Sequence, residues 1–198
     1  FVEKTGKKVR KDNFMYMHDE YDFITANVDR EIVGENAGLE CKTMSAFNDY
    51  DLEGGEVPAY YFSQCQHYMA VKGYERMYLA ILVFQKGIFI NTIERNEEFI
   101  KGMIEAEIRF WTENIKKNQM PAPDGSEAST DALNELYPES TARSIALPNA
   151  DALIREYLSI SSKIKELKEK QAEIKNRLCA RLGDAESGED THYKCSWK

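Results

Sequence analysis

Two carboxylates and an amine occur close together in the first part of the chain. Asp29 is followed eleven residues later by Glu40-Cys41-Lys42. Carboxylate oxygens and a backbone carbonyl, with water completing the shell, are ligands that suit Mg²⁺ or Mn²⁺. Lys42 beside such an ion would orient an attacking water or offset the charge that develops on a phosphate. This combination predicts a metal site for the cleavage of nucleic acid.

The surrounding residues predict the strands that must hold this set. Residues 23–32 and 38–43 have the composition of two short strands, with a turn at residues 34–37 between them. Since side chains alternate along a strand, Glu40 and Lys42 should share one face. Pairing of the two strands as a hairpin would bring the aspartate alongside.

A Glu-x-Lys pair on a solvated strand face is the ordinary alternative, because charged residues make up 30% of the chain. The apolar neighbours of the pair favour instead a hairpin in the core. A charged side chain is costly in a core unless it is paired or binds a ligand, so its presence there indicates a function. These neighbours are Phe23, Ile24, Val28, Ile32, Leu39 and Cys41.

A helix predicted over residues 58–72 supplies further polar groups. It opens with proline and ends before Gly73. Gln64 and Tyr68 are four residues apart and share a face, so their amide and phenol could hold a phosphate oxygen. Both residues are also ordinary on a helix surface. His67 has no second His or Cys at helical spacing and is interpreted as a surface or packing residue.

Four short motifs follow one another along the chain. They are EKTGKKV at residues 3–9, ANVDR at 26–30, LECKT at 39–43 and QCQHYMAV at 64–71. In this order and at these intervals they resemble the phage lambda-type exonucleases, also called YqaJ-type viral recombinase nucleases, of the PD-(D/E)xK superfamily. The resemblance covers roughly residues 1–120.

The resemblance implies a fold and an activity. The fold is a restriction-endonuclease-like core of the α+β (α/β) class, with a central mixed β-sheet flanked by helices. The activity is that of a Mg²⁺-dependent (or Mn²⁺-dependent) exonuclease that digests linear double-stranded DNA from its 5′ end. Its products are 3′ single-stranded ends for a single-strand annealing protein in phage-type recombination. The family also implies a ring-like homo-oligomer, a trimer, which threads duplex DNA through a central channel.

Residue roles carry over from the resemblance position by position. The metal ligands that it implies are Asp29, Glu40 and the Cys41 carbonyl, and the catalytic set is Asp29, Glu40, Lys42, Gln64 and Tyr68, with Lys42 as the water-orienting base. The family also has an acidic residue in an upstream helix, and Glu3 follows too late to be that acid. We therefore expect a full-length protein longer than 198 residues, with further site residues before Phe1.

Net charge and cysteine content constrain the function less strongly than the motifs do. The net charge of −8 is unusual for a DNA-binding protein, but residues 1–12 hold five basic and two acidic side chains, a local charge of +3. Residues 151–182 hold eight basic and five acidic side chains, also +3. The four cysteines lie far apart, which indicates neither a zinc site nor a disulfide framework. No apolar stretch is long enough to span a membrane, and we expect a cytoplasmic protein.

The remaining sequence predicts the following organisation. Residues 76–84 and 88–93 are strands, and residues 96–117 form a helix whose apolar face (Phe99, Met103, Ile104, Ala106, Phe110, Trp111 and Ile115) packs in the core. The domains are a nuclease core at 1–120, a connector at 121–150, a long helix at 151–182 and a tail at 183–198, in which structure resumes at Tyr193 and Trp197. The long helix repeats apolar residues in steps of four and three, as in a coiled coil. A long helix packed on its own domain is the equal alternative.

Two functions from different classes fit these patterns. The first is a metal-dependent DNA end-processing nuclease. The second is a non-catalytic scaffold of recombination, which binds DNA ends and recruits partners through the long helix. Asp29, Glu40, Lys42 and Gln64 together favour the nuclease, since a scaffold has no chemical need for all of them.

Overall fold

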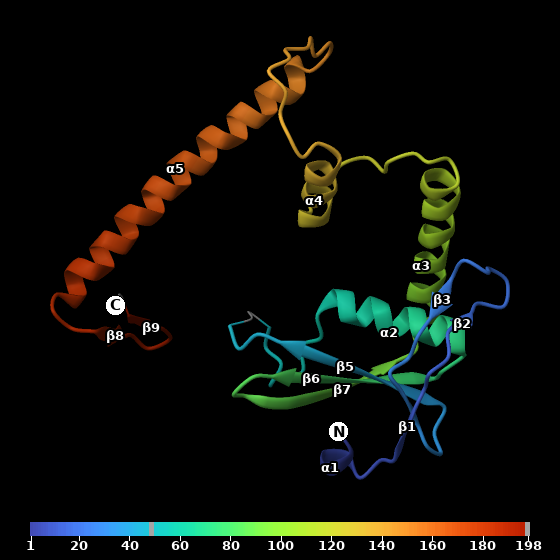
Figure 1. Cartoon of the computed structure of the whole chain (residues 1–198). Coiled ribbons are helices and arrows are strands. Elements are labelled where there is room, and N and C mark those ends of the chain that lie inside the picture. Colours follow the sequence, from blue (N-terminus) through green and yellow to red (C-terminus); the bar gives the residue numbers. More distant parts are fainter. Residues whose placement is uncertain (48–49, 197–198) are drawn as a thin grey trace. The chain divides into compact units, whose positions relative to one another are not determined.

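The computed structural model describes residues 1–47 and 50–196, which divide into two compact units, Phe1–Gly125 and Ser126–Lys198 (Figure 1). Each unit is described by itself. Trp197, where the sequence predicted renewed structure, lies outside the described residues.

The first unit is built on a mixed five-stranded sheet. Its strands lie in the order β1-β4-β5-β6-β7, with β5 and β6 parallel and the other neighbours antiparallel. Their bounds are Val9–Lys11 (β1), Arg30–Ile32 (β4), Ala37–Met44 (β5), Arg76–Val83 (β6) and Gly87–Glu94 (β7). A short helix, α1 (Val2–Thr5), precedes them. The predicted fold class, a central mixed sheet flanked by helices, is confirmed.

Helix α2 (Ala59–Lys72) connects the two parallel strands and covers one face of the sheet (Figure 1). Pro58 precedes it, and Gly73 ends it in the left-handed conformation at φ 67°, with its N–H bonded to the Met69 carbonyl. Parallel strands require a crossover connection of this kind. The proline and the glycine therefore fix the ends of the helix that faces the sheet centre.

The core lies mainly between α2 and β6. Alternate β6 side chains, from Met77 to Val83, pack with Cys65 and Met69 of α2. The intervening residues Tyr78 and Ala80 belong to a smaller cluster with residues of β4 and β5. Because β6 is buried on both faces over most of its length, its sequence reads as a nearly continuous apolar run.

The prediction of one continuous strand over residues 23–32 is wrong. It is divided into β3 (Thr25–Ala26), which pairs with β2 (Tyr16–Met17), and β4, which pairs with β1 and β5. The break falls at Asp29, whose Oδ2 accepts the backbone N–H of Cys41 at 2.9 Å. A side-chain oxygen thus takes the place of a ladder partner, and the β4–β5 pairing starts only at Arg30.

The helix predicted over residues 96–117 comprises α3 (Glu97–Phe110) and a π-helical turn, η1 (Trp111–Ile115). The expectation of a buried apolar face is wrong. Ile100 is the buried residue among those described in α3, whereas Phe110 and Ile115 are each 48% exposed. Ile104 packs against the core and Trp111 stacks on Phe23 with the ring centroids 4.8 Å apart, so the apolar face is covered only in part. Figure 1 shows the helix running away from the sheet along its length.

The second unit begins with α4 (Glu127–Leu136), inside the segment that the sequence predicted to be a connector. Ser126 caps this helix by accepting the Ser129 N–H at 3.1 Å, a local signal that the prolines around it obscured. The long helix α5 (Asp151–Leu182) and a hairpin of β8 (Ser187–Glu189) and β9 (Lys194–Ser196) follow. In the described part of the chain, no helix is both long and apolar enough for a bilayer.

Candidate active site

Strand β5 presents two charged side chains to the face that α2 covers. Glu40 is in register with Leu79 and Lys42 with Ile81, both of which belong to the α2-facing core. The Lys42 ammonium lies 2.7 Å from Glu40 Oε1, and Glu40 is only 4% exposed. The alternation predicted for this strand thus places a carboxylate and an amine together at the buried side of the sheet.

Helix α2 supplies the polar groups above this pair. The Gln64 amide donates to Glu40 Oε1 at 3.2 Å and to the Tyr68 hydroxyl at 2.7 Å. Tyr61, which the sequence analysis did not single out, has its ring centroid 5.4 Å from the Lys42 ammonium. Its spacing of three residues before Gln64 was the available signal, because residues three apart share a helix face.

Asp29 contacts the same strand from the connection between β3 and β4. Its carboxylate is held by the Cys41 backbone N–H, while the Cys41 side chain is exposed. Asp29 is near enough to Glu40 for its charge to act on the Glu40 carboxyl group. The structure therefore brings together all the residues predicted for the site, from the β3–β4 connection, β5 and α2.

The electrostatics of the site are dominated by the burial of Glu40. Burial raises the pKa of its carboxyl group; the Lys42 hydrogen bond opposes this shift, and the Asp29 charge adds to it. Burial lowers the pKa of Lys42, but the hydrogen bond to Glu40 and the nearby charges of Glu40, Tyr68 and Asp29 together outweigh that effect, and the pKa is raised. Two acidic groups close together in a buried site favour a bound cation.

The donor set fits a hard divalent cation. Glu40 Oε2 is buried without a hydrogen-bond partner, which is the kind of orphaned oxygen that a cation would satisfy. No group of three or more His, Cys, Asp and Glu side chains that could hold a metal occurs within residues 1–47 and 50–196. If Asp29, Glu40 and the Cys41 carbonyl held a cation, the remaining positions would be left to water, as Mg²⁺ and Mn²⁺ prefer.

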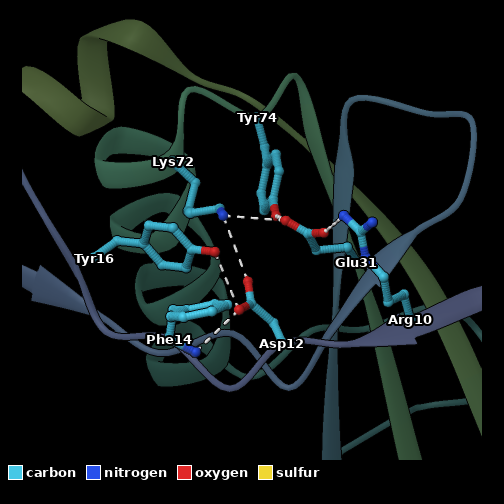
Figure 2. Close-up of polar contacts among 7 residues, drawn as sticks. All are labelled: Arg10, Asp12, Phe14, Tyr16, Glu31, Lys72 and Tyr74. Atoms are coloured by element: carbon cyan, nitrogen blue, oxygen red, sulfur yellow. Dashed lines mark hydrogen bonds and ion pairs between the residues drawn. The ribbon is translucent and has the colours of Figure 1, made fainter.

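A second polar cluster joins the end of α2 to β4 (Figure 2). The Lys72 ammonium lies 3.4 Å from Asp12 Oδ2, 3.2 Å from Glu31 Oε1 and 3.2 Å from the centroid of the Tyr16 ring. Tyr74 also donates to Glu31, at 3.1 Å. Arg10, together with Lys72 and Tyr74, holds the pKa of Glu31 at about 2 against the opposing effect of burial. The cluster fixes β4 against the helix that carries Gln64, through Glu31, which is two residues after Asp29.

Replacing Lys72 with methionine should destabilise the first unit. The Lys72 and Asp12 side chains are 9% and 2% exposed, so the variant leaves the buried Asp12 carboxylate without this counterion, whereas Glu31 keeps Arg10. We expect the free energy of unfolding to fall by about 3 kcal/mol, the low end for breaking a buried ion pair. Urea denaturation followed by circular dichroism measures it. Lys117→Met removes an exposed pair with Glu113 and should cost less than about 1 kcal/mol; equal losses would contradict this account.

His67 lies outside the site, on the side of α2 that faces β3 and α3. Its Nδ1 is 2.7 Å from Glu107 Oε1 and its Nε2 is 2.9 Å from the Thr25 carbonyl. Both partners present acceptor oxygens, and the hydrogen bond to Glu107 raises the pKa of His67, which favours the doubly protonated ring. The pair borders an open pocket of about 440 Å³, beside the stacked rings of Phe23 and Trp111.

This ion pair makes stability depend on pH. The hydrogen bond to Glu107 raises the pKa of His67 above its usual 6.5, and burial opposes it. A raised folded-state pKa means that the stabilisation is complete below about pH 6.5 and is lost as the pH rises through the folded value. We expect the Tm deficit of His67→Gln to be largest in mildly acidic buffer and to shrink in alkaline buffer. His192→Gln, in the second unit, is the control; a deficit that does not change with pH would refute the prediction.

The basic residues at the start of the chain are less available for DNA than their number indicates. Lys7 pairs with Glu35, and Arg10 pairs with Glu31. Lys4 donates to the Ile88 carbonyl at 2.9 Å. Much of the local positive charge predicted for residues 1–12 therefore holds β1 and α1 on the sheet.

The residues predicted for the site lie on adjoining elements: acidic and basic groups on a central strand, with an amide and a phenol on the covering helix. Residues 1–75 match the family described as a YqaJ-like viral recombinase domain. The chain is 41% identical over 202 residues to the uncharacterized protein YqaJ of Bacillus subtilis (strain 168). Residues 1–75 thus resemble the YqaJ-like viral recombinase domain family, and the predicted resemblance is confirmed. The match covers 100% of this chain and 63% of the length of that relative.

Solved structures with a similar arrangement include an alkaline exonuclease, LHK-Exo, from Laribacter hongkongensis. Its crystal structure has a TM-score of 0.43 and 19% identity, and the match covers 59% of this chain and 66% of that chain. The structure of LHK-Exo in complex with dAMP has a TM-score of 0.49 and 19% identity, over 69% of this chain and 66% of that chain.

Proposed function

We propose that this chain is the catalytic part of a metal-dependent deoxyribonuclease that acts in recombination. The observation that carries the proposal is that Lys42 and Gln64 converge on Glu40 Oε1, while Glu40 Oε2 is buried beside them without a hydrogen-bond partner. Burying a carboxylate in this way destabilises a fold unless a ligand satisfies it. The match of residues 1–75 to a viral recombinase domain agrees with a role in recombination.

We assign the following roles to the residues of the site. Asp29, Glu40 and the Cys41 carbonyl would hold Mg²⁺ or Mn²⁺, which when bound supplies Lewis acidity to a phosphate. Lys42 orients the attacking water and places an ammonium where negative charge grows on the phosphate as the water oxygen bonds to phosphorus. The backbone N–H of Cys41 holds Asp29 in position for this set.

Gln64 and Tyr68 position the phosphate. Their mutual hydrogen bond keeps the amide and the phenol on the side of the site opposite β5. The Gln64 amide uses its two N–H donors on Glu40 and on the Tyr68 hydroxyl, which leaves the O–H of Tyr68 to donate to a phosphate oxygen. The pair therefore orients the scissile phosphate over Lys42 rather than taking part in proton transfer.

The substrate that we infer is the end of linear double-stranded DNA, digested from 5′ to 3′ to leave single-stranded 3′ ends for an annealing protein. Nucleotide release from linear duplex, compared with covalently closed circular duplex, tests the requirement for an end. Phosphorothioate linkages placed at only the 5′ or only the 3′ ends test the direction. We expect release from linear DNA alone, blocked by the 5′ modification; release from circles, or blocking by the 3′ modification alone, would refute the corresponding part.

We also propose a ring-like trimer. Closed cyclic symmetry lets modest basic patches from three protomers face one axis, so a protomer with a net charge of −8 can still present a positive channel. Light scattering of the full-length protein at micromolar concentration should give three times the protomer mass. A monomer mass, together with digestion that stops after a few nucleotides per encounter, would exclude the ring.

A further inference from the structure

Helix α5 carries an apolar seam that no residue of the described chain buries. The seam is defined here as Ile160, Ile164, Leu167, Gln171, Ile174 and Leu178, which are spaced alternately by four and three residues. Its apolar members are between 45% and 62% exposed. This spacing places them on one narrow stripe, as at the a and d positions of a coiled coil.

The seam is bordered on both sides by positive charge. In the heptad that the seam defines, the e and g positions between residues 163 and 177 are all basic: Lys163, Lys168, Lys170, Lys175 and Arg177. The carboxylates of the same segment, Glu166, Glu169 and Glu173, are at positions away from the seam. Residues at e and g positions select the partner of a coiled coil, because they contact its e and g residues.

This pattern opposes pairing of α5 with a second copy of itself. A parallel pair would bring Lys163 near Lys168 and Lys170 near Lys175 of the other helix, and an antiparallel pair would also bring basic residues together. The pattern also differs from that of a membrane-surface helix, which needs a wide apolar face. Here the stripe is narrow and is interrupted by Gln171.

We infer that the seam binds a partner protein through a helix whose own a and d positions are apolar and whose e and g positions are acidic. Apolar side chains of the two helices then interdigitate, while Glu or Asp of the partner faces the basic border of α5. Gln171 sets the register by pairing with a polar residue of the partner, as single polar a positions do. This interaction is separate from the nuclease site and does not depend on its activity.

Two designed peptides of about four heptads test the inference. Both have Ile and Leu at a and d; one has Glu at every e and g position and the other has Lys. We expect the full chain to bind the Glu peptide at least about tenfold more tightly than the Lys peptide in low-salt titration calorimetry, since several complementary charge pairs add. Changing Lys163, Lys168, Lys170 and Lys175 together to Glu should reverse the preference.

Seam variants separate this binding from simple charge attraction. Ile164→Gln should weaken binding of the Glu peptide at least about tenfold, whereas Asn176→Gln, away from the seam, should not change it. Circular dichroism checks that both variants keep their helix content.

Four results would overturn the inference. The first is a chain that dimerises through α5, with dimerisation lost in Ile164→Gln. The second is binding to phosphatidylserine vesicles but to neither peptide, which would assign the seam to a lipid surface. The third is a lowered Tm of the isolated Ile164→Gln chain, which would show that the seam packs within the chain. The fourth is equal binding, or no binding, of both peptides.

Discussion

Replacing Lys42 with alanine lowers the single-turnover rate of duplex cleavage by roughly 10²–10³-fold, a typical loss for a group that stabilises developing charge. Affinity for DNA changes little, because the ammonium acts mainly on charge that is present in the transition state and not in the bound substrate. The contacts of Lys42 with Glu40 and with the Tyr61 ring hold its ammonium at the site. Rapid-quench kinetics with end-labelled duplex give the rate, and fluorescence anisotropy gives the affinity.

Lys101→Ala is the matched control for this variant. Lys101 is exposed on α3, and its loss should leave the cleavage rate unchanged. Binding of both variants should fall steeply with salt, because phosphate contacts release counterions. A Lys42→Ala protein that cleaves at the wild-type rate would show that Lys42 has only a structural role.

Replacing Glu40 with glutamine abolishes both cleavage and the response of the protein to divalent ions. The change keeps the size of the side chain and removes its charge, so the first carboxylate ligand is lost. We expect Mn²⁺ or Mg²⁺ to raise the Tm of the wild type, because an ion that binds only the folded state stabilises it. The same ions should leave the Tm of the variant unchanged.

In the absence of divalent ions, Glu40→Gln should be no less stable than the wild type. Glu40 is 4% exposed and one of its oxygens has no partner, so the wild-type fold carries the cost of an incompletely satisfied charge. Glu98→Gln, an exposed change on α3, controls for the loss of one negative charge. A Glu40→Gln protein that unfolds far more readily without metal, and that still gains stability with Mn²⁺, would assign Glu40 to the fold instead of a metal site.

Local sequence signals predicted the elements that hold the site. The apolar run of β6, and the proline and glycine that bound α2, are properties of neighbouring residues. The same is true of the alternation that puts Glu40 and Lys42 on one face of β5. Tyr68 and Gln64 were placed together because they are four residues apart on a helix.

Contacts between distant residues were not predictable in this way. Lys72 meets Asp12 across 60 residues and Glu31 across 41, and neither spacing has a local pattern. The interruption of the first strand at Asp29 also depends on a distant group, the backbone N–H of Cys41. The prediction of a buried apolar face on α3 was wrong because sequence periodicity shows that apolar residues share one side of the helix. It does not show how far the sheet extends beneath that side.

The non-catalytic scaffold and the nuclease make opposite predictions for one reaction. The decisive measurement is the release of acid-soluble nucleotides from linear duplex DNA by the full-length protein, with Mg²⁺ or Mn²⁺ and with EDTA, beside the Glu40→Gln variant. The nuclease account predicts release by the wild type with either ion, none with EDTA and none by the variant. Wild-type protein that binds the ends without releasing nucleotides, or release that the variant retains, would contradict it.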